Sequence, residues 1–276
     1  MLMASPPSTA WRVPDFVRAD GRVRVVFGAA ARGAVPLTIA ESGGSRVRFP
    51  RTGEGVLINT GGGMAGGDRM NVSIAARAGA DAVLTTQAAE KVYRSVGPDT
   101  EIAVALTLES KCRLAWLPQE QILFDGARLS RTFDVTLSAD ASLILVESVV
   151  FGRLAMGERV QTGRFRDRWR IRRDGRLVFA EDVCLDGAVA GTLARRAVAN
   201  GARALATVLH IAPDAERLAQ DARDVLAVGS CECGLTAFDG MVLARFLSAD
   251  PQALRTDLAR FVEALRGEPM PRSWQT

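Results

Sequence analysis

The chain has few of the side chains on which nucleophilic catalysis and tight metal binding usually depend. Its 276 residues include one histidine, one tyrosine and four cysteines. A Ser–His–Asp or Cys–His arrangement needs a histidine beside its nucleophile. The single His210 lies in the apolar run ALATVLHIA, where a buried, hydrogen-bonded core residue is the expected role. No catalytic set assembles from these residues, and we expect a protein that is not an enzyme.

The cysteines, at positions 112, 184, 231 and 233, do not follow a zinc-binding pattern. A structural zinc site needs four ligands, with two or more residues between the members of each pair. Only Glu232 separates Cys231 from Cys233. These two are still a pair of soft ligands, so metal binding there stays open. We otherwise expect reduced thiols, as in a cytosol, and no tightly bound cofactor.

Long apolar runs, a leader sequence and concentrated basic charge are also missing. No apolar run reaches the ~18–20 residues that span a bilayer. The opening MLMASPPSTAWRVPDF has neither the basic n-region nor the apolar h-region of a secretory signal. The net charge is +4 and is spread along the chain, unlike the clustered Lys and Arg of nucleic-acid-binding proteins. We expect a cytoplasmic protein that binds neither nucleic acid nor a membrane.

Glycine, in contrast, is concentrated within residues 57–95, LINTGGGMAGGDRMNVSIAARAGADAVLTTQAAEKVYRS. Gly61, Gly63 and Gly66 fit the dinucleotide pattern G-x-G-x-x-G, which needs a helix directly after the glycines. Residues 70–75 instead alternate with a period of two, which predicts a strand. We therefore interpret the glycines as a turn or bulge with positive-φ positions, followed by a polar cluster at 85–94.

Short segments with strand-like patterns cover most of the chain, with turn residues between them. They are 22–27, 56–59, 70–75, 82–87, 101–108, 113–117, 121–124, 131–137, 142–151, 164–172, 177–185 and 204–211. Asp174-Gly175 is a preferred pair for a type I′ hairpin turn. Helical spacing occurs at 213–228 and at 250–266, where Asp250 and Pro251 form an N-cap and first helical position. We predict a mainly β fold, as a sandwich, barrel or stacked sheets, with two C-terminal α-helices.

The same pattern predicts the domain organisation. A flexible tail at 1–20 precedes a single domain at 21–276. Within that domain we expect a β region at about 21–212 and a helical region at about 213–266. No long linker, repeat or low-complexity segment divides the chain.

Five separated segments occur in a fixed order along the chain. They are GGGMAGGD at 61–68, TTQAAEKVYRS at 85–95, WLPQEQILFDGARL at 116–129, FGRLAMGE at 151–158 and MPRSW at 270–274. Together they resemble the UreD (UreH) family of urease accessory proteins, from about Arg22 to the C-terminus. The resemblance implies a stacked-strand, β-helix-like fold with two helices.

The resemblance also implies a function as a scaffold. Such a protein would bind the urease apoprotein and the accessory protein UreF, which recruits the GTPase UreG. Nickel would be delivered to urease through an internal passage and bound only transiently. A passage must release its ion as well as admit it, and nickel binds carboxylates more weakly than imidazole or thiolate. One histidine and many turn-placed acids suit a passage, as they also suit an ordinary protein surface.

Three carboxylates are candidates for transient nickel contact: Asp68, Glu147 and Glu181. Asp68 follows the glycine run, where an aspartate also commonly caps a turn by accepting backbone N–H bonds. Glu147 interrupts the apolar run LILVESVVF. It must face solvent or be buried and paired, because burying it unpaired would be costly.

A second group comprises candidates for a partner or passage surface: Gln87, Glu90, Lys91, Tyr93, Arg94, Glu120, Asp125, Glu158 and Trp274. Their alternative roles are surface ion pairs and turn caps. Trp274 either docks into a partner, since Trp is enriched at interface hot spots, or packs back onto its own domain.

Two other functions stay open at this point. A hydrolase or lyase could use two carboxylates on a β scaffold, and detectable turnover would reveal it. A nickel-storage protein could hold the metal through Cys231 and Cys233, and stoichiometric nickel on the purified chain would reveal that.

Overall fold

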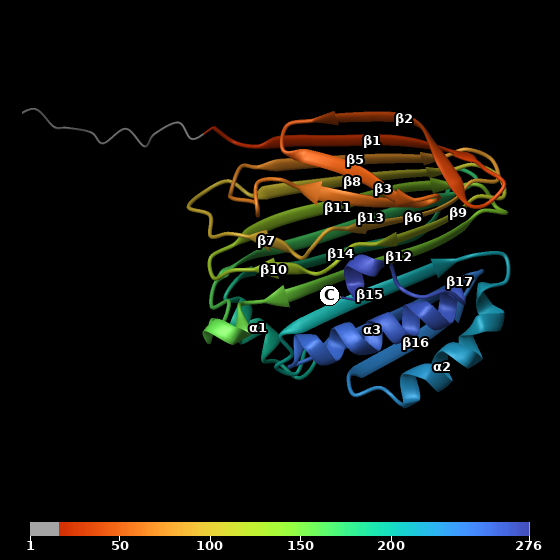
Figure 1. Cartoon of the computed structure of the whole chain (residues 1–276). Helices are drawn as coiled ribbons and strands as arrows, with labels where there is room; N and C mark the ends of the chain where they lie inside the picture. Colours follow the sequence, from red (N-terminus) through yellow and green to blue (C-terminus); the bar gives the residue numbers. More distant parts are fainter. Residues whose placement is uncertain (1–16, 276) are drawn as a thin grey trace, which may run out of the picture.

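The structure is a computed structural model that describes residues 17–275. Two stacked β-sheets form most of it, and helices cover part of one sheet (Figure 1). The seven-stranded sheet contains β1 (Asp20–Ala29), β2 (Ala34–Ser42), β5 (Arg69–Ala76), β8 (Thr100–Leu108), β11 (Arg128–Leu137), β13 (Gly163–Arg173) and β14 (Arg176–Gly187).

The ten-stranded sheet contains the remaining strands. These are β3 (Ser45–Arg51), β4 (Glu54–Asn59), β6 (Asp81–Thr86), β7 (Glu90–Val92), β9 (Arg113–Leu117), β10 (Gln121–Leu123), β12 (Ser142–Phe151), β15 (Ala204–Ile211), β16 (Glu232–Phe238) and β17 (Met241–Ser248). The α-helices are α1 (Val189–Leu193), α2 (Ala219–Ala227) and α3 (Pro251–Arg266). Short 3-10 turns lie at η1 (Leu154–Met156), η2 (Ala215–Leu218) and η3 (Arg272–Trp274).

The chain winds back and forth between the two sheets, as in a β-helix. From β4 to β13 most successive strands alternate between them, so neighbours within a sheet come from successive coils and run parallel. In the first sheet β1, β5, β8, β11 and β13 pair in this way. In the second, β4, β6, β9 and β12 do the same. The predicted mainly β, β-helix-like architecture is confirmed.

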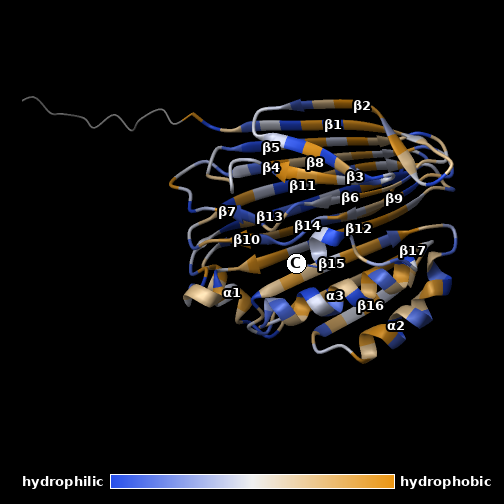
Figure 2. Ribbon diagram, viewed as in Figure 1, coloured by the Kyte–Doolittle hydropathy of each residue, from blue (hydrophilic) through white to orange (hydrophobic). Residues whose placement is uncertain are grey.

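In-register pairing stacks the same position of successive coils into inward-facing rows. One row runs through Val23, Val72, Val104, Phe133 and Trp169, and all five side chains are buried. Hydrophobic and hydrophilic residues alternate along the strands of the first sheet (Figure 2). This period of two sends one set of side chains into the core between the sheets and the other outward.

A third layer covers the outer face of the second sheet. The apolar stripe of α3, which includes Leu254, Leu258 and Phe261, is buried there. Phe261 meets Phe246 of β17 with ring centroids 5.4 Å apart. Because β12 has a sheet core on one side and this helix layer on the other, nearly all of its residues are buried.

Every predicted strand is present, and the region at about 213–266, predicted to be helical, also contains two strands. The hairpin β16–β17 lies between α2 and α3. Its turn is Asp239-Gly240, with φ of 49° and 70°, the same type of pair as the correctly predicted Asp174-Gly175. The strands β2, β3 and β7 and the short helix α1 were also not predicted. Both predicted C-terminal helices are confirmed, with Asp250 accepting the Gln252 N–H at 2.8 Å.

Of the predicted tail at 1–20, residues 1–16 lie outside the described part of the chain, and β1 begins at Asp20.

Candidate functional site

The glycine loop and the polar segment after it pack directly against each other. Met64 and Val92 form an isolated parallel bridge, and the Tyr93 hydroxyl donates to the Gly62 carbonyl at 3.0 Å. A Cβ on Gly63 would lie 2.5 Å from the Tyr93 ring, and one on Gly66 would lie 1.9 Å from the Ser95 Oγ. The glycines therefore permit a close approach, and β5 follows them, which confirms the interpretation as a turn.

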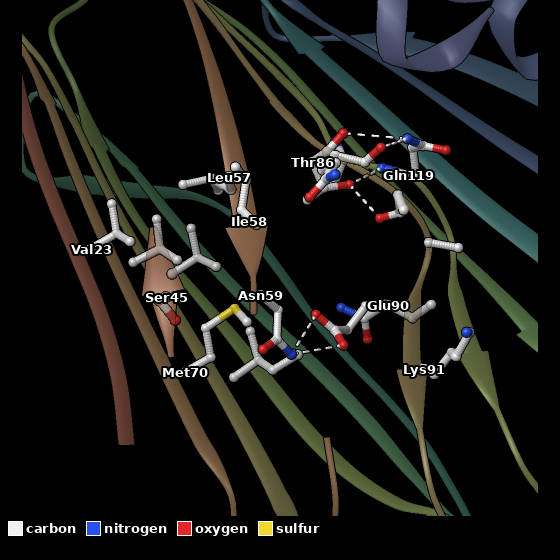
Figure 3. A pocket seen from close by; sticks show the side chains of 18 of the residues that line it. Val23, Ser45, Leu57, Ile58, Asn59, Met70, Thr86, Glu90, Lys91 and Gln119 are labelled. Carbon is white, nitrogen blue, oxygen red and sulfur yellow. Dashed lines mark hydrogen bonds between the residues drawn. The ribbon is translucent and has the colours of Figure 1, made fainter. Parts of the chain in front are cut away.

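A cavity of about 380 Å³ lies between the sheets beside this contact. Three of the sequence segments that carry the family resemblance contribute to its wall. Its lining includes Gly62, Gly63, Gln87, Glu90, Lys91, Trp116, Gln119 and Gln121. Segments far apart in the sequence are thus brought to one hollow (Figure 3).

Glu90 lines this cavity away from its deep end. Its two oxygens accept from the Asn59 Nδ2 at 3.0 and 3.1 Å (Figure 3). Burial raises the pKa of Glu90 to about 7, and the hydrogen bond from Asn59 opposes the rise. Nearby, Gln121 is 8% exposed and its Oε1 has no hydrogen-bond partner. A buried oxygen without a partner is uncommon and indicates room for water or a ligand.

The deep end of the cavity is closed by an ion-pair cluster around Arg131, which is 2% exposed. Its guanidinium donates to Asp167 through Nε at 3.0 Å and through Nη2 at 2.6 Å. Its Nη1 donates to Glu147, and the Trp116 indole N–H donates to the same carboxylate at 2.8 Å. The rings of Phe133 and Phe165 lie 5.7 and 5.9 Å from the guanidinium carbon.

The protonation of this cluster follows from burial and pairing. Burial raises the pKa of Glu147 to about 7, although Arg131 opposes the rise. Burial lowers the pKa of Arg131, but the attraction and hydrogen bonds of Asp167 and Glu147 outweigh it, and the net pKa is raised. Arg131 is therefore a permanent buried cation held between two carboxyl groups.

A second, smaller cavity of about 50 Å³ lies on the other side of the cluster. Arg131 and Glu147 line both cavities, and Asp167, Glu181 and Thr207 line the second. Glu181 pairs with Arg245 at 3.0 Å, while its Oε2 is buried without a partner. Burial raises the pKa of Glu181. Acidic side chains therefore occur in the larger cavity, at its deep end and in the smaller cavity.

The structure brings two of the three nickel candidates together. Glu147 and Glu181 both line the smaller cavity. Asp68 lines neither cavity. Its oxygens accept from the backbone N–H groups of Ala19 at 2.9 Å and Ala65 at 2.7 Å. This is the turn-capping role that was the alternative for Asp68.

The candidates for a partner or passage surface also divide into residues that line a cavity and residues that do not. Gln87, Glu90 and Lys91 line the larger cavity, whereas Tyr93 and Arg94 are exposed beside it.

Three of the other four candidates form ion pairs or cap backbone N–H groups within the chain. Glu120 pairs with Arg255 at 2.8 Å, and Asp125 caps the Gln161 and Thr162 N–H groups at 2.7 and 3.1 Å. The Arg153 guanidinium, 2.8 Å away, lowers the pKa of Glu158.

Trp274 is not a surface residue. It is 6% exposed, and its indole N–H donates to the Leu117 carbonyl at 3.0 Å. Arg255 lies 4.6 Å from its ring. The structure therefore corrects the suggestion of an exposed docking residue in favour of packing on the domain itself.

Sequence reasoning missed Arg131 and Asp167, although a signal was present. In β11, Arg131 alternates with Leu129 and Phe133, and in β13, Asp167 alternates with Phe165 and Trp169. A charged residue at the apolar phase of a period-two pattern points into the core. Within either strand alone the charge has no visible partner, but the two charges are opposite and adjacent in register.

The His and Cys side chains and the acids make no conventional metal site in the described part of the chain. Within residues 17–275, no three His, Cys, Asp or Glu side chains are grouped to hold a metal ion. His210 is buried, with its Nδ1 3.2 Å from the Leu143 carbonyl oxygen, and burial lowers its pKa. Burial raises the pKa of Cys233, and that of Cys231 to about 11. The thiolate form that binds metal is therefore less favoured at both cysteines than at an exposed cysteine.

None of the helices within residues 17–275 combines the length and apolar character needed to cross a membrane.

Comparison with known proteins gives one consistent result. Residues 19–275 match the family model described as UreD urease accessory protein. The chain is 49% identical to the urease accessory protein UreD of Methylobacterium sp. (strain 4-46), over 99% of this chain and 100% of that protein. It is 51% identical to the urease accessory protein UreD of Rhodopseudomonas palustris (strain BisB18), over 91% of each chain.

Proposed function

The chain belongs to the UreD family of urease accessory proteins, and from this premise we propose that it is a scaffold through which Ni²⁺ reaches the urease apoprotein. Family membership confirms the expectation of an accessory protein rather than an enzyme. Nickel transfer, the partners UreF and UreG, and a cytoplasmic location are parts of the proposal, based on the family resemblance of the sequence.

The main support for an internal route is the arrangement of the two cavities. The larger cavity, the Arg131 cluster and the smaller cavity adjoin one another, and Glu90, Glu147 and Glu181 occur along this succession. Carboxylate and amide oxygens hold nickel less tightly than imidazole or thiolate does. An ion bound by such groups can leave again, as a transfer route requires. We propose that nickel enters at the Glu90 cavity or at Glu181 and passes the cluster between them.

The test is activation of urease with and without this chain. The cognate urease subunits, UreF and UreG are produced together with nickel, and urease activity is measured per amount of urease. We expect activity to collapse when the chain is omitted. Glu147→Gln keeps the shape of the side chain but removes a charge that attracts the passing ion, and we expect it to lower activation about tenfold.

The matched control is Glu101→Gln, which removes an exposed carboxylate of β8 that pairs with Arg69 outside both cavities. It should leave activation unchanged. Full activation without the chain would reject the scaffold function. Equal activation by the Glu147 and Glu101 variants would reject the internal route while leaving the scaffold.

A further inference from the structure

A positive charge occupies the position where the two cavities meet. Arg131 is buried and lines both of them. Its guanidinium bridges Glu147 on β12 of one sheet to Asp167 on β13 of the other. Any ion that moves from the larger cavity to the smaller one must therefore pass the Arg131–Glu147 contact.

A divalent cation at this point is attracted and repelled by the same cluster. The oxygens of Glu147 and Asp167 attract it, and the guanidinium repels it strongly at close range in a low-dielectric interior. The rings of Phe133 and Phe165 flank the guanidinium, and the smaller cavity beside it has a volume of only about 50 Å³. The ion and the guanidinium therefore compete for the same two carboxylates.

Replacing the Arg131 guanidinium by another cation is electrostatically easier than removing it. Taking Arg131 away leaves two buried carboxylates without a cation, which is strongly unfavourable. Exchanging the guanidinium for a divalent ion keeps both carboxylates paired. Unsatisfied oxygens lie on each side: Gln121 Oε1 in the larger cavity, on a side chain 8% exposed, and Glu181 Oε2 in the smaller one. They offer the ion an oxygen before and after the cluster.

Building on the proposed function, we propose that Arg131 is a tethered cation that occupies the place of the travelling divalent ion, which advances by displacing the guanidinium from Glu147 or Asp167. When the ion leaves, the guanidinium returns to its carboxylates. Arg131 thereby keeps the constriction closed at rest, and it keeps the acids from retaining metal. It is a positioning residue for transfer rather than a ligand.

The experiment replaces the tethered cation by a free one. The full-length variant Arg131→Ala is unfolded thermally in rising Ni²⁺, beside the wild type. We expect a lower Tm for Arg131→Ala without metal, and a rise of several degrees with Ni²⁺ because the ion binds only the folded state. The wild type should show no such rise. The triple variant Arg131→Ala, Glu147→Gln, Asp167→Asn should not respond either.

The matched control is Arg166→Ala, which breaks the exposed Arg166–Asp182 pair on β13 and β14. Its Tm should not depend on Ni²⁺. A folded Arg131→Ala chain that responds to Ni²⁺ no more than Arg166→Ala would overturn the proposal.

If Arg131→Ala does not fold without metal, two further measurements test the proposal. The chain is refolded with and without Ni²⁺, and nickel retention by Arg131→Lys is compared with that of the wild type. Lysine keeps the charge but cannot make the bridging contacts of a guanidinium, so it should retain more nickel. Recovery only with Ni²⁺, or greater retention by Arg131→Lys, supports the proposal. Failure of both overturns it.

None of these measurements uses urease, so the proposed function and the tethered-cation proposal can be rejected independently. Urease activation that does not need the chain would reject the proposed function, whatever Ni²⁺ does to Arg131→Ala. Normal dependence on the chain, with no effect of Ni²⁺ on Arg131→Ala, would reject only the tethered cation.

Discussion

At the scale of single residues, the cavity changes the acid–base behaviour of Glu90. Its half-buried carboxyl accepts from Asn59, and burial raises its pKa to about 7. The unfolded chain loses this proton near the ordinary value of 4.5. The folded chain thus binds the proton more tightly, so the contribution of Glu90 to stability is full below pH 4.5 and is lost as the pH rises through 7.

We therefore predict that Glu90→Gln removes part of the pH dependence of stability. The variant should match the wild type near pH 4.5 and exceed it by up to about 3 kcal/mol at pH 8. Urea unfolding of both chains from pH 4.5 to 8 measures this difference. Glu101→Gln, at an exposed position on β8, serves as the control. A constant difference between Glu90→Gln and wild type across this range would contradict the prediction.

At the scale of elements, the C-terminal segment packs against the second sheet and the helix α3. The turn η3 places Trp274 in the cluster formed by α3, β12, β15 and β17. Its indole N–H reaches the Leu117 carbonyl of β9, and Arg255 of α3 lies over the ring. Residues far apart in the sequence are thus joined at one point beside the helix layer.

Trp274→Ala should accordingly destabilise the chain. We expect a loss of about 3–5 kcal/mol in the free energy of unfolding, because a cavity forms and the Leu117 carbonyl loses its donor. Urea unfolding at one pH measures it. Val228→Ala, at a position 72% exposed, should change stability by less than about 0.5 kcal/mol. A loss of partner binding at unchanged stability would instead assign Trp274 to an interface.

Elements with a strong local pattern could be predicted from the sequence, and those that depend on partners across the fold could not. The predicted strands and α3 carry clear periodicity and a cap at Asp250. The edge strand β2 does not, because Leu37 and Ile39 are exposed and its burial does not alternate. The strand β7 has three residues and exists through parallel pairing with β10.

The candidate site shows the same division. Glu147 was identifiable because an acid interrupts an apolar run. Its partners Arg131 and Asp167 lie 16 residues before it and 20 after it in the sequence, and only the register of β11 with β13 and the stacking of the two sheets bring the three together. Asp68, selected from its motif, has a local capping role that a single sequence does not distinguish from a site role.

At the scale of the whole molecule, the winding of the chain between two sheets places the two cavities in its interior. Each coil adds one layer of side chains to the interior, and most rows are apolar, such as the one through Phe133 and Trp169. The neighbouring row contains Arg131 and Asp167 and is polar at one place only along its described length, next to Met70 and Ile102. The charged constriction between the two cavities lies at that single polar interruption.

If nickel uses this interior, a bulky side chain at the mouth of the larger cavity should block it without unfolding the protein. Ala88 lines this cavity and is exposed, so Ala88→Trp can fill the mouth without displacing core residues. We expect a several-fold loss of urease activation, with unchanged Tm and unchanged association with the urease subunits. Activity, thermal unfolding and co-purification measure the three quantities. Ala227→Trp, on the exposed end of α2 and outside the cavity, is the matched control. Full activation by Ala88→Trp would mean that nickel reaches urease by another path, since a filled mouth leaves the outer surfaces of both sheets intact.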